Sequence, residues 1–164
     1  MNVNKDSYLS LGSNIISRSE NLNTAITLLA DHKFINVIKK SSIYESEPLY
    51  YENQKKFLNM VVMIDTKLDQ LDLLKTCNLI ERKIGRRISN YKNRERIIDI
   101  DILTFSQCSY ERDNLIIPHP RIHERKFVLM PWAEIDPKYF LFNYKKNVIS
   151  LLNCTKDKSK VIKL

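Results

Sequence analysis

Glycine is scarce in this sequence, which has only Gly12 and Gly85 among its 164 residues. Average usage of about 7% would give about eleven. Two glycines cannot build the loops G-x-x-x-x-G-K-[ST] or G-x-G-x-x-G, which cradle nucleotide phosphates with backbone amides. A site for nucleotide phosphates in this chain therefore has to use side chains and metal ions. We expect the two glycines where backbone geometry requires them.

Cysteines and long apolar runs are also sparse. Cys77, Cys108 and Cys154 are an odd number at wide spacing, which fits neither a disulfide framework nor a zinc site, so we expect reduced and mostly buried thiols. The longest apolar stretch, 60–64, is far shorter than the ~18 residues of a membrane span, so no membrane partner is expected. Because the first residues lack the apolar core of a secretory signal, we expect a cytoplasmic protein.

Positive charge, in contrast, is in excess. The net charge is +8, from 27 Lys+Arg against 19 Asp+Glu, and it favours anionic partners such as nucleotides, phosphates or nucleic acid. A length of 164 residues with 43% hydrophobic and 28% charged residues is typical of one globular domain, which we expect to span 1–164.

Hydrophobic periodicity predicts strands over 8–11, 34–44, 57–64 and 97–105. The strand over 57–64 is apolar on both faces and is expected in the middle of a sheet. One helix begins at a capping box of Ser17 and Glu20, and a second ends at Gly85. A polar loop is expected over 45–56, a short helix from Pro120 to before Pro131, and a last helix over 148–152.

The resulting order β-α-β-β-α-β predicts an α+β fold with a ferredoxin-like core. In this split β-α-β arrangement the sheet contains antiparallel strands and the helices pack on it.

Two acidic residues in the strand over 97–105 are candidates for metal binding. The period of two places Asp99 and Asp101 on one face and the neighbouring isoleucines on the other. The carboxylates are then roughly 7 Å apart along the backbone and can converge on a cation. Oxygen ligands that leave several positions free suit a Mg²⁺ ion that carries nucleotide phosphates. Seven cations in the preceding run, 82–96, place phosphate-binding charge beside this pair.

Several motifs occur in the order and spacing of one enzyme family. They are Gly12-Ser13-Asn14 after a strand, Ser46-Glu47-Pro48-Leu49, Phe57-Leu58-Asn59, Glu81 with Gly85-Arg86, Arg96-Ile97-Ile98-Asp99-Ile100-Asp101, and Pro118-His119-Pro120-Arg121. With these motifs the chain resembles the 6-hydroxymethyl-7,8-dihydropterin pyrophosphokinases of folate biosynthesis over about residues 8–135. The resemblance implies transfer of the pyrophosphoryl group of ATP to the hydroxymethyl oxygen of the pterin, with release of AMP and use of two Mg²⁺ ions.

The resemblance also implies a role for each matching position. Asp99 and Asp101 would hold both Mg²⁺ ions and, with Arg86 and Arg96, carry catalysis. The other positions implied for ATP are His119 and Arg125 at the phosphates, Asn78 and Glu81 along the nucleotide, and the main chain of Ile102 and Ile116 at adenine. The positions implied for the pterin are Phe57 and Phe127 on its faces, Asn59 at its edge, and backbone groups near Ser46 and Leu49.

The chain departs from the family in a lid segment. Asn93-Arg94-Glu95 stands where Trp-Gly-Pro is usual, and Ile88 stands where an arginine is common. We expect the loops over 14–18, 47–56 and 86–96 to close over the substrates. The family's usual state, a monomer, is expected here.

Two other functions stay open at this point. The altered lid leaves open a catalytically weakened relative, and a basic ferredoxin-like sheet leaves open an RNA-binding module. The K/R-G-F/Y-G/A-F-V motif of such modules is absent and both aspartates are retained. We therefore favour the enzyme and expect no nucleic-acid partner.

Overall fold

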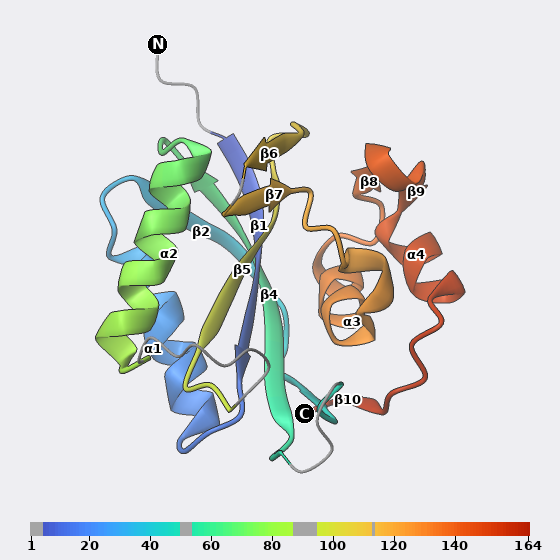
Figure 1. Ribbon diagram of the computed structural model, residues 1–164, viewed down its shortest axis with the longest axis horizontal. Helices are drawn as coiled ribbons and strands as arrows, with labels where there is room; N and C mark the ends of the chain where they lie inside the picture. Colours follow the sequence, from blue (N-terminus) through green and yellow to red (C-terminus); the bar gives the residue numbers. More distant parts are fainter. Residues whose placement is uncertain (1–4, 50–53, 87–94, 113) are drawn as a thin grey trace.

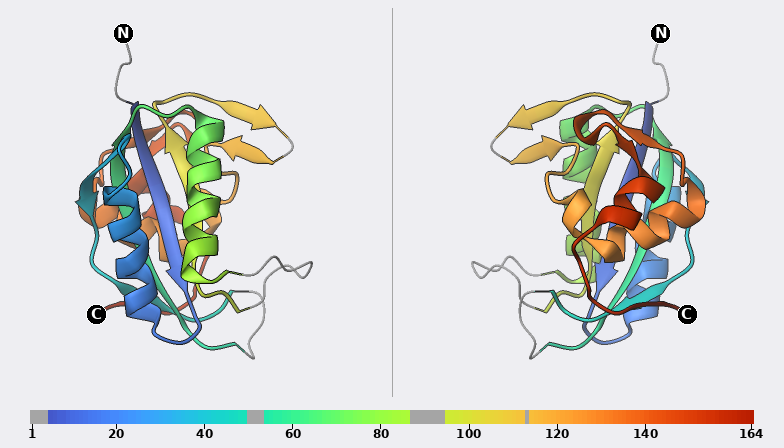
Figure 2. Two further views of the ribbon diagram at one scale, coloured as in Figure 1. Left: turned by 90° about the vertical axis from the view of Figure 1, so that its left-hand side faces the viewer. Right: turned by 90° about the vertical axis from the view of Figure 1, so that its right-hand side faces the viewer.

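The computed structural model describes residues 5–49, 54–86, 95–112 and 114–164. One antiparallel sheet separates two layers of helices, with α1 (Arg18–Ala30) and α2 (Gln70–Ile84) on one face and α3 (Lys126–Ile135) and α4 (Val148–Cys154) on the other (Figures 1 and 2). The prediction of helices packed on a sheet with antiparallel strands is confirmed. None of the described helices is long and apolar enough to cross a membrane.

The sheet is built around β4 (Phe57–Thr66) and β1 (Lys5–Ser13), which pair along their whole length. β5 (Asp99–Phe105) lies on the other side of β1, while β2 (Ile35–Lys40) and β3 (Tyr44–Ser46) both pair with β4. The central position predicted for the strand over 57–64 is thus confirmed. The expected strand over 34–44 is in fact two strands, and Ser46 lies in β3 rather than in the predicted loop over 45–56.

Alternation along the strands feeds two separate cores. Leu9 and Leu11 of β1 pack toward α1 and α2, whereas Tyr8 packs toward α3. Ile100 of β5 likewise belongs to the α1 and α2 side, which leaves Asp99 and Asp101 on the α3 side. The predicted division of this strand into an isoleucine face and an aspartate face is confirmed.

The helices on the first face begin and end differently from one another. Ser17 is the N-cap of α1, but its φ of 55° is left-handed and its side chain makes no capping bond, so the predicted capping box is wrong. The Nδ2 of Asn21 instead donates to the carbonyls of Ile15 and Ile16, at 3.1 and 2.8 Å, and holds the turn. Gly85 ends α2 with a φ of 113°, as predicted.

The other face is covered by a short 3-10 turn, η1 (Ile122–Glu124), and by α3 and α4. The expected helix from Pro120 does not form, because α3 begins at Lys126 and continues through Pro131. Proline removes one helical hydrogen bond. The loss is offset by burial of the next residue, Trp132, whose ring centroid lies 5.0 Å from that of Tyr8.

Smaller elements complete the chain. β6 (Tyr110–Arg112) pairs with β7 (Leu115–Ile117), and β8 (Phe140–Leu141) pairs with β9 (Lys146–Asn147) around η2 (Phe142–Tyr144). β10 (Val161–Lys163) adds an edge strand to β3. All three cysteines are free, but only Cys77 is buried, and Cys154 at the end of α4 is exposed, against the expectation of mostly buried thiols.

Candidate active site

A pocket of about 190 Å³ lies on the α3 side of the sheet. Its position follows from strand register. Gly12 of β1 pairs with Asp99 of β5 on one side and with Asn59 of β4 on the other, so these residues form one row across three strands. With no side chain at Gly12, the floor between the carboxylate and the amide is open. A Cβ there would lie 3.4 Å from Asn59 Oδ1 and 4.0 Å from Phe57 Cδ1.

Gly12 therefore leaves the floor of the pocket open, and it has no unusual backbone angle. The expectation that both glycines are fixed by backbone geometry holds for Gly85, the only described glycine with a positive φ, and fails for Gly12.

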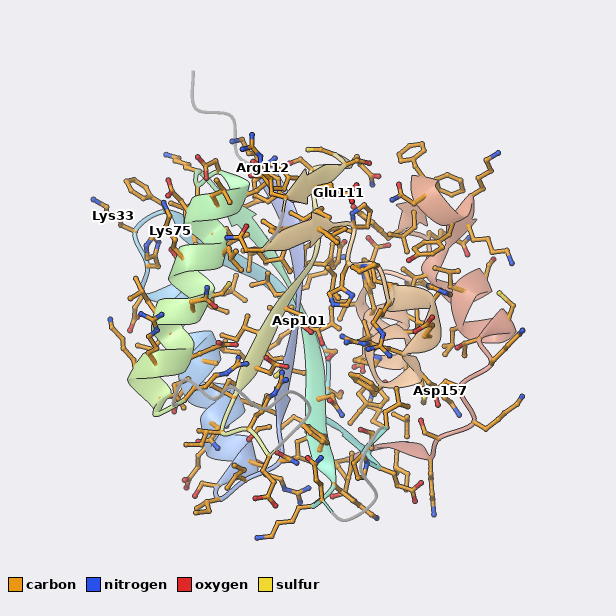
Figure 3. The ribbon with its side chains drawn as sticks, viewed as in Figure 1. Lys33, Lys75, Asp101, Glu111, Arg112 and Asp157 are labelled. Carbon is orange, nitrogen blue, oxygen red and sulfur yellow. The ribbon has the colours of Figure 1, made fainter. Side chains whose placement is uncertain are left out.

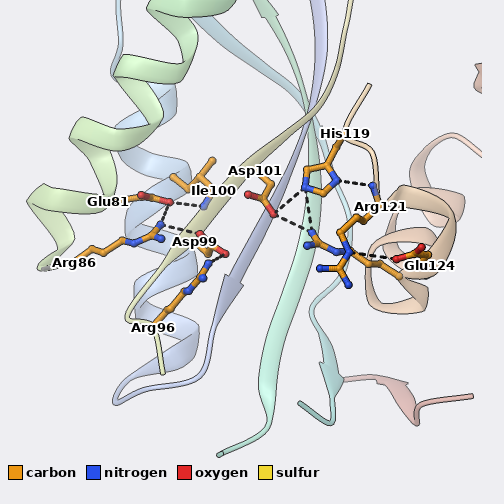
Figure 4. Close-up of polar contacts among 10 residues, drawn as sticks. Glu81, Arg86, Arg96, Asp99, Ile100, Asp101, His119, Arg121 and Glu124 are labelled. Carbon is orange, nitrogen blue, oxygen red and sulfur yellow. Dashed lines mark hydrogen bonds and ion pairs between the residues drawn. The ribbon is translucent and has the colours of Figure 1, made fainter. Parts of the chain in front are cut away.

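Asp99 is held between two arginines (Figure 4). The Nη1 of Arg86 lies 2.8 Å from Asp99 Oδ1, and Arg96 pairs with the other carboxylate oxygen. Arg86 also pairs with Glu81 of α2, whose Oε1 accepts a hydrogen bond of 2.7 Å from the amide of Ile100. Burial and the nearby Asp99 carboxylate raise the pKa of Glu81 to about 7.

Asp101 forms a second cluster on the same strand face (Figure 4). The Nη1 of Arg125 lies 3.1 Å from Asp101 Oδ2, and His119 Nε2 lies 3.9 Å from the same oxygen. Burial, then the neighbouring Asp99 carboxylate, raise the pKa of Asp101. A divalent cation held by Asp101 would favour its ionised form and so oppose this rise in pKa.

His119 has a defined hydrogen-bonding state. Its Nδ1 accepts from the amide of Arg121 at 3.1 Å, which leaves Nε2 to carry the proton of the neutral ring, 3.9 Å from Asp101 Oδ2. Burial, together with the positive charges of Arg125 and Arg121, lowers the pKa of His119 to about 4. The ring is therefore a neutral donor at neutral pH.

The two acidic residues fit a magnesium site that the protein completes only in part. Among the described residues, no group of three His, Cys, Asp or Glu side chains is arranged around a metal position. Two carboxylates that leave the other ligand positions to phosphate oxygens and water suit Mg²⁺, which gives up its waters reluctantly.

Aromatic and amide groups line the rest of the pocket. Phe57 comes from the start of β4, and Phe127 comes from the first turn of α3. Asn59 is 2% exposed, and its Nδ2 donates to Ser46 Oγ at 2.9 Å, so its oxygen is the group left for a ligand. Leu49 lines the same wall.

Ten of the predicted site residues line this pocket. They are Ser46, Leu49, Phe57, Asn59, Arg96, Asp99, Asp101, His119, Arg125 and Phe127. Arg86 and Glu81 join it through Asp99. Asn78 lies exposed on α2, Ile102 is buried in the core and Ile116 is exposed on β7, so these three side chains do not line the pocket.

Part of the predicted lid cannot be placed, because Ile88, Asn93 and Arg94 fall outside the described residues. Within the described part of the chain, the structure adds Asn14 to the site. Its Oδ1 accepts from the Arg96 amide at 2.7 Å, and its Nδ2 donates to Gln54 Oε1 at 3.1 Å. The motif Gly12-Ser13-Asn14 contained this residue but gave no sign of its partners, which are far away in sequence.

Paired carboxylates, two arginines and two aromatic rings line one pocket, an arrangement that suits an enzyme transferring a phosphoryl-type group to a flat ring. A family model described as 7,8-dihydro-6-hydroxymethylpterin-pyrophosphokinase (HPPK) matches residues 8–137, and the chain belongs to this family. The resemblance found in the motifs is confirmed, and with it the prediction of an ATP-dependent transferase.

Relatives with assigned names agree with the family. The chain is 45% identical over 133 residues to the 2-amino-4-hydroxy-6-hydroxymethyldihydropteridine pyrophosphokinase of Bacillus subtilis. The aligned residues cover 81% of this chain and 79% of the relative. It is also 42% identical over 134 residues to the folic acid synthesis protein fol1 of Schizosaccharomyces pombe. Here the aligned residues cover 82% of this chain and 18% of that longer protein.

A solved structure shows the same fold. The wild-type HPPK-DHPS of Plasmodium falciparum with pteroate superimposes with a TM-score of 0.75 at 17% identity, over 92% of this chain and 42% of that one. The match therefore lies within one part of a longer chain.

Proposed function

We propose that this chain transfers the terminal pyrophosphoryl group of ATP to the hydroxymethyl oxygen of 6-hydroxymethyl-7,8-dihydropterin, giving AMP and the pterin diphosphate. The observation that carries the proposal is the position of Asp99 and Asp101 on one strand face, each paired with arginine, in the pocket that Phe57 and Phe127 line. Charged side chains suited to phosphates and a metal ion thus lie next to two aromatic side chains between which a flat ring could stack.

Asp99 and Asp101 would hold two Mg²⁺ ions together with the phosphates of ATP. When bound, these ions draw charge from the phosphate oxygens. Arg86, Arg96 and Arg125, which pair with these carboxylates, would pair with the phosphates in the substrate complex, in the bidentate geometry that arginine favours.

The pterin would lie between Phe57 and Phe127, because flat rings stack on aromatic faces. The free oxygen of Asn59 would accept a hydrogen bond from its edge, with backbone groups near Ser46 and Leu49 completing recognition. On the nucleotide side we assign Asn78, Glu81 and the main chain of Ile102 and Ile116. Burial of the Ile102 side chain is consistent with a role for its main chain only.

Catalysis would come mostly from position and charge. The hydroxymethyl oxygen attacks the β-phosphorus in line, the bond to the α-phosphate oxygen breaks, and AMP leaves. Arg86, Arg96, Arg125 and the Nε2–H of His119 would stabilise the charge that develops on the phosphates. Asp101 would accept the hydroxyl proton.

The test is AMP release from ATP and Mg²⁺, with and without the pterin. Pterin-dependent AMP without ADP supports the proposal. Mg²⁺-dependent ATP binding without AMP release would favour a catalytically weakened relative, whose altered lid no longer closes. A salt-resistant, sequence-specific complex with RNA would favour the RNA-binding module instead.

The strand order β5-β1-β4-β2, with every neighbour antiparallel, supports a ferredoxin-like split β-α-β core as part of this proposal. One domain over 1–164, a monomeric state and a cytoplasmic location stay predictions.

A further inference from the structure

The segment 155–164, which we call the strap, lies outside the residues matched by the family model and touches both walls of the pocket. It contains four lysines. In the fold it passes beneath α3 and then joins the sheet as β10 (Figure 1). Asp157 lies beside the lower end of α3 (Figure 3).

On the first wall, the strap caps the helix that carries Phe127. The amide of Lys126 is the first of α3, and first-turn amides have no partner within their own helix. Arg125, the N-cap residue, makes no side-chain capping bond. Asp157 supplies the missing acceptor, since its Oδ2 accepts from the Lys126 amide at 2.8 Å.

Asp157 is itself held in place. Its Oδ1 accepts from the amide of Ser159 at 2.8 Å, and the carbonyl of Ser159 accepts from Lys126 Nζ at 3.3 Å. Thr155 Oγ1 donates to the carbonyl of His123 at 2.9 Å. These contacts fix the strap against the turn from which Arg125 and Phe127 enter the pocket.

On the second wall, the strap supports β3. Val161 pairs with Ser46, the residue that orients Asn59. The amide of Leu164 donates to the carbonyl of Ile43 at 3.0 Å, and Lys163 Nζ lies 3.2 Å from Glu134 of α3. One short segment therefore ties the helix wall to the strand wall.

We propose that the strap sets the distance between the two walls of the pterin slot, and that Asp157 is a positioning residue for Phe127. The inference rests on the proposed function, because it needs Phe127 and the Asn59–Ser46 pair to border the pterin. Asp157 does not touch the substrate. It acts by holding the first turn of α3 in the conformation that receives the ring.

The test compares Asp157→Ala with two matched variants. Asp157→Asn keeps a capping oxygen, and Lys158→Ala changes the next, exposed residue of the strap. We expect Asp157→Ala to raise the KM for the pterin about fivefold, with kcat unchanged. This factor corresponds to the stability that a helix typically loses with its cap, which binding of the pterin would then have to restore. Lys158→Ala should behave as the wild type. Asp157→Asn keeps one oxygen for the Lys126 amide but sets its Nδ2 against the amide of Ser159, so its KM should lie between those of the wild type and Asp157→Ala.

A second readout needs no activity. Hydrogen exchange at the amides of the first turn of α3, measured without substrates, should accelerate in Asp157→Ala, less in Asp157→Asn, and not in Lys158→Ala. Unchanged exchange in Asp157→Ala, a KM of Asp157→Asn as high as that of Asp157→Ala, or a fall in kcat at constant KM would each overturn the inference. If the wild type releases no pterin-dependent AMP, the proposed function fails, and exchange alone then decides whether the strap holds α3.

Discussion

Replacing Gly12 by alanine separates stability from pterin affinity. The new methyl group would sit in the middle of the row from Asp99 to Asn59, 3.4 Å from Asn59 Oδ1. That contact is ordinary for a carbon and an oxygen, so the fold has room for it. The methyl group would, however, occupy the space through which the edge of the pterin reaches the amide.

The two expected effects have opposite signs. Gly12 is not among the residues with positive φ, so alanine at this position should stabilise the protein by about 0.5 kcal/mol or slightly more, since the unfolded chain loses freedom. Loss of one hydrogen bond to Asn59 costs binding about 1.4 kcal/mol, which is about tenfold in the KM for the pterin.

The assay is urea unfolding together with AMP release at varied pterin concentration, and Gly85→Ala is the matched control. Gly85 has a φ of 113°, which costs an alanine about 1–2 kcal/mol of stability, and the residue lies outside the pocket. We expect Gly85→Ala to lose stability and keep the wild-type KM. A Gly12→Ala protein with the wild-type KM for the pterin would refute the placement of the ring.

Three further changes test the other parts of the site. Asp101→Asn should abolish Mg²⁺-dependent AMP release, because Asn keeps the shape of the side chain and loses its charge. The melting temperature should stay within a few degrees of the wild type. An active variant would show that Asp101 is not part of the metal site. Phe127→Leu should raise the KM for the pterin about tenfold through loss of aromatic stacking worth roughly 1 kcal/mol or more, with the KM for ATP as the internal control. The pKa of His119 is lowered from 6.5 to about 4, so between these pH values the unfolded chain binds more protons than the native state. The stability that this residue contributes therefore falls as the pH is lowered through that range. Urea unfolding should show the free-energy difference between wild type and His119→Gln shrinking over the same range, and a constant difference would contradict burial as the cause.

The parts of the fold that follow from local pattern were predictable. Asp99 and Asp101 share a face because successive side chains of a strand point to opposite faces, and the five residues 98–102 alternate between isoleucine and aspartate. The same holds for Gly85, where a left-handed helix end requires glycine.

Other parts depend on partners that are distant in sequence. β10 forms only because β3 offers it an edge, and nothing in a lysine-rich segment predicts a strand. Pro131 reads as a helix end, yet burial of Trp132 carries α3 past it. The many basic residues near Asp99 and Asp101 in the sequence predict that arginines pair with the two aspartates. The particular pairs, such as Asp101 with Arg125, depend on how α3 docks on the sheet.

The buried amide of Asn14 also couples two segments of the chain mechanically. It accepts from the Arg96 amide and donates to Gln54 and to the carbonyl of Lys55, at 2.7, 3.1 and 3.4 Å. Hydrogen bonds tolerate shifts of only a few tenths of an ångström before they weaken. If the segment around Gln54 and Lys55 moved away from β1, Asn14 would shift and its bond to Arg96 would weaken, and the reverse holds for the segment around Arg96. Insertions or deletions in one of them are therefore tolerated only with compensating changes in the other, and the two segments should vary together among related proteins.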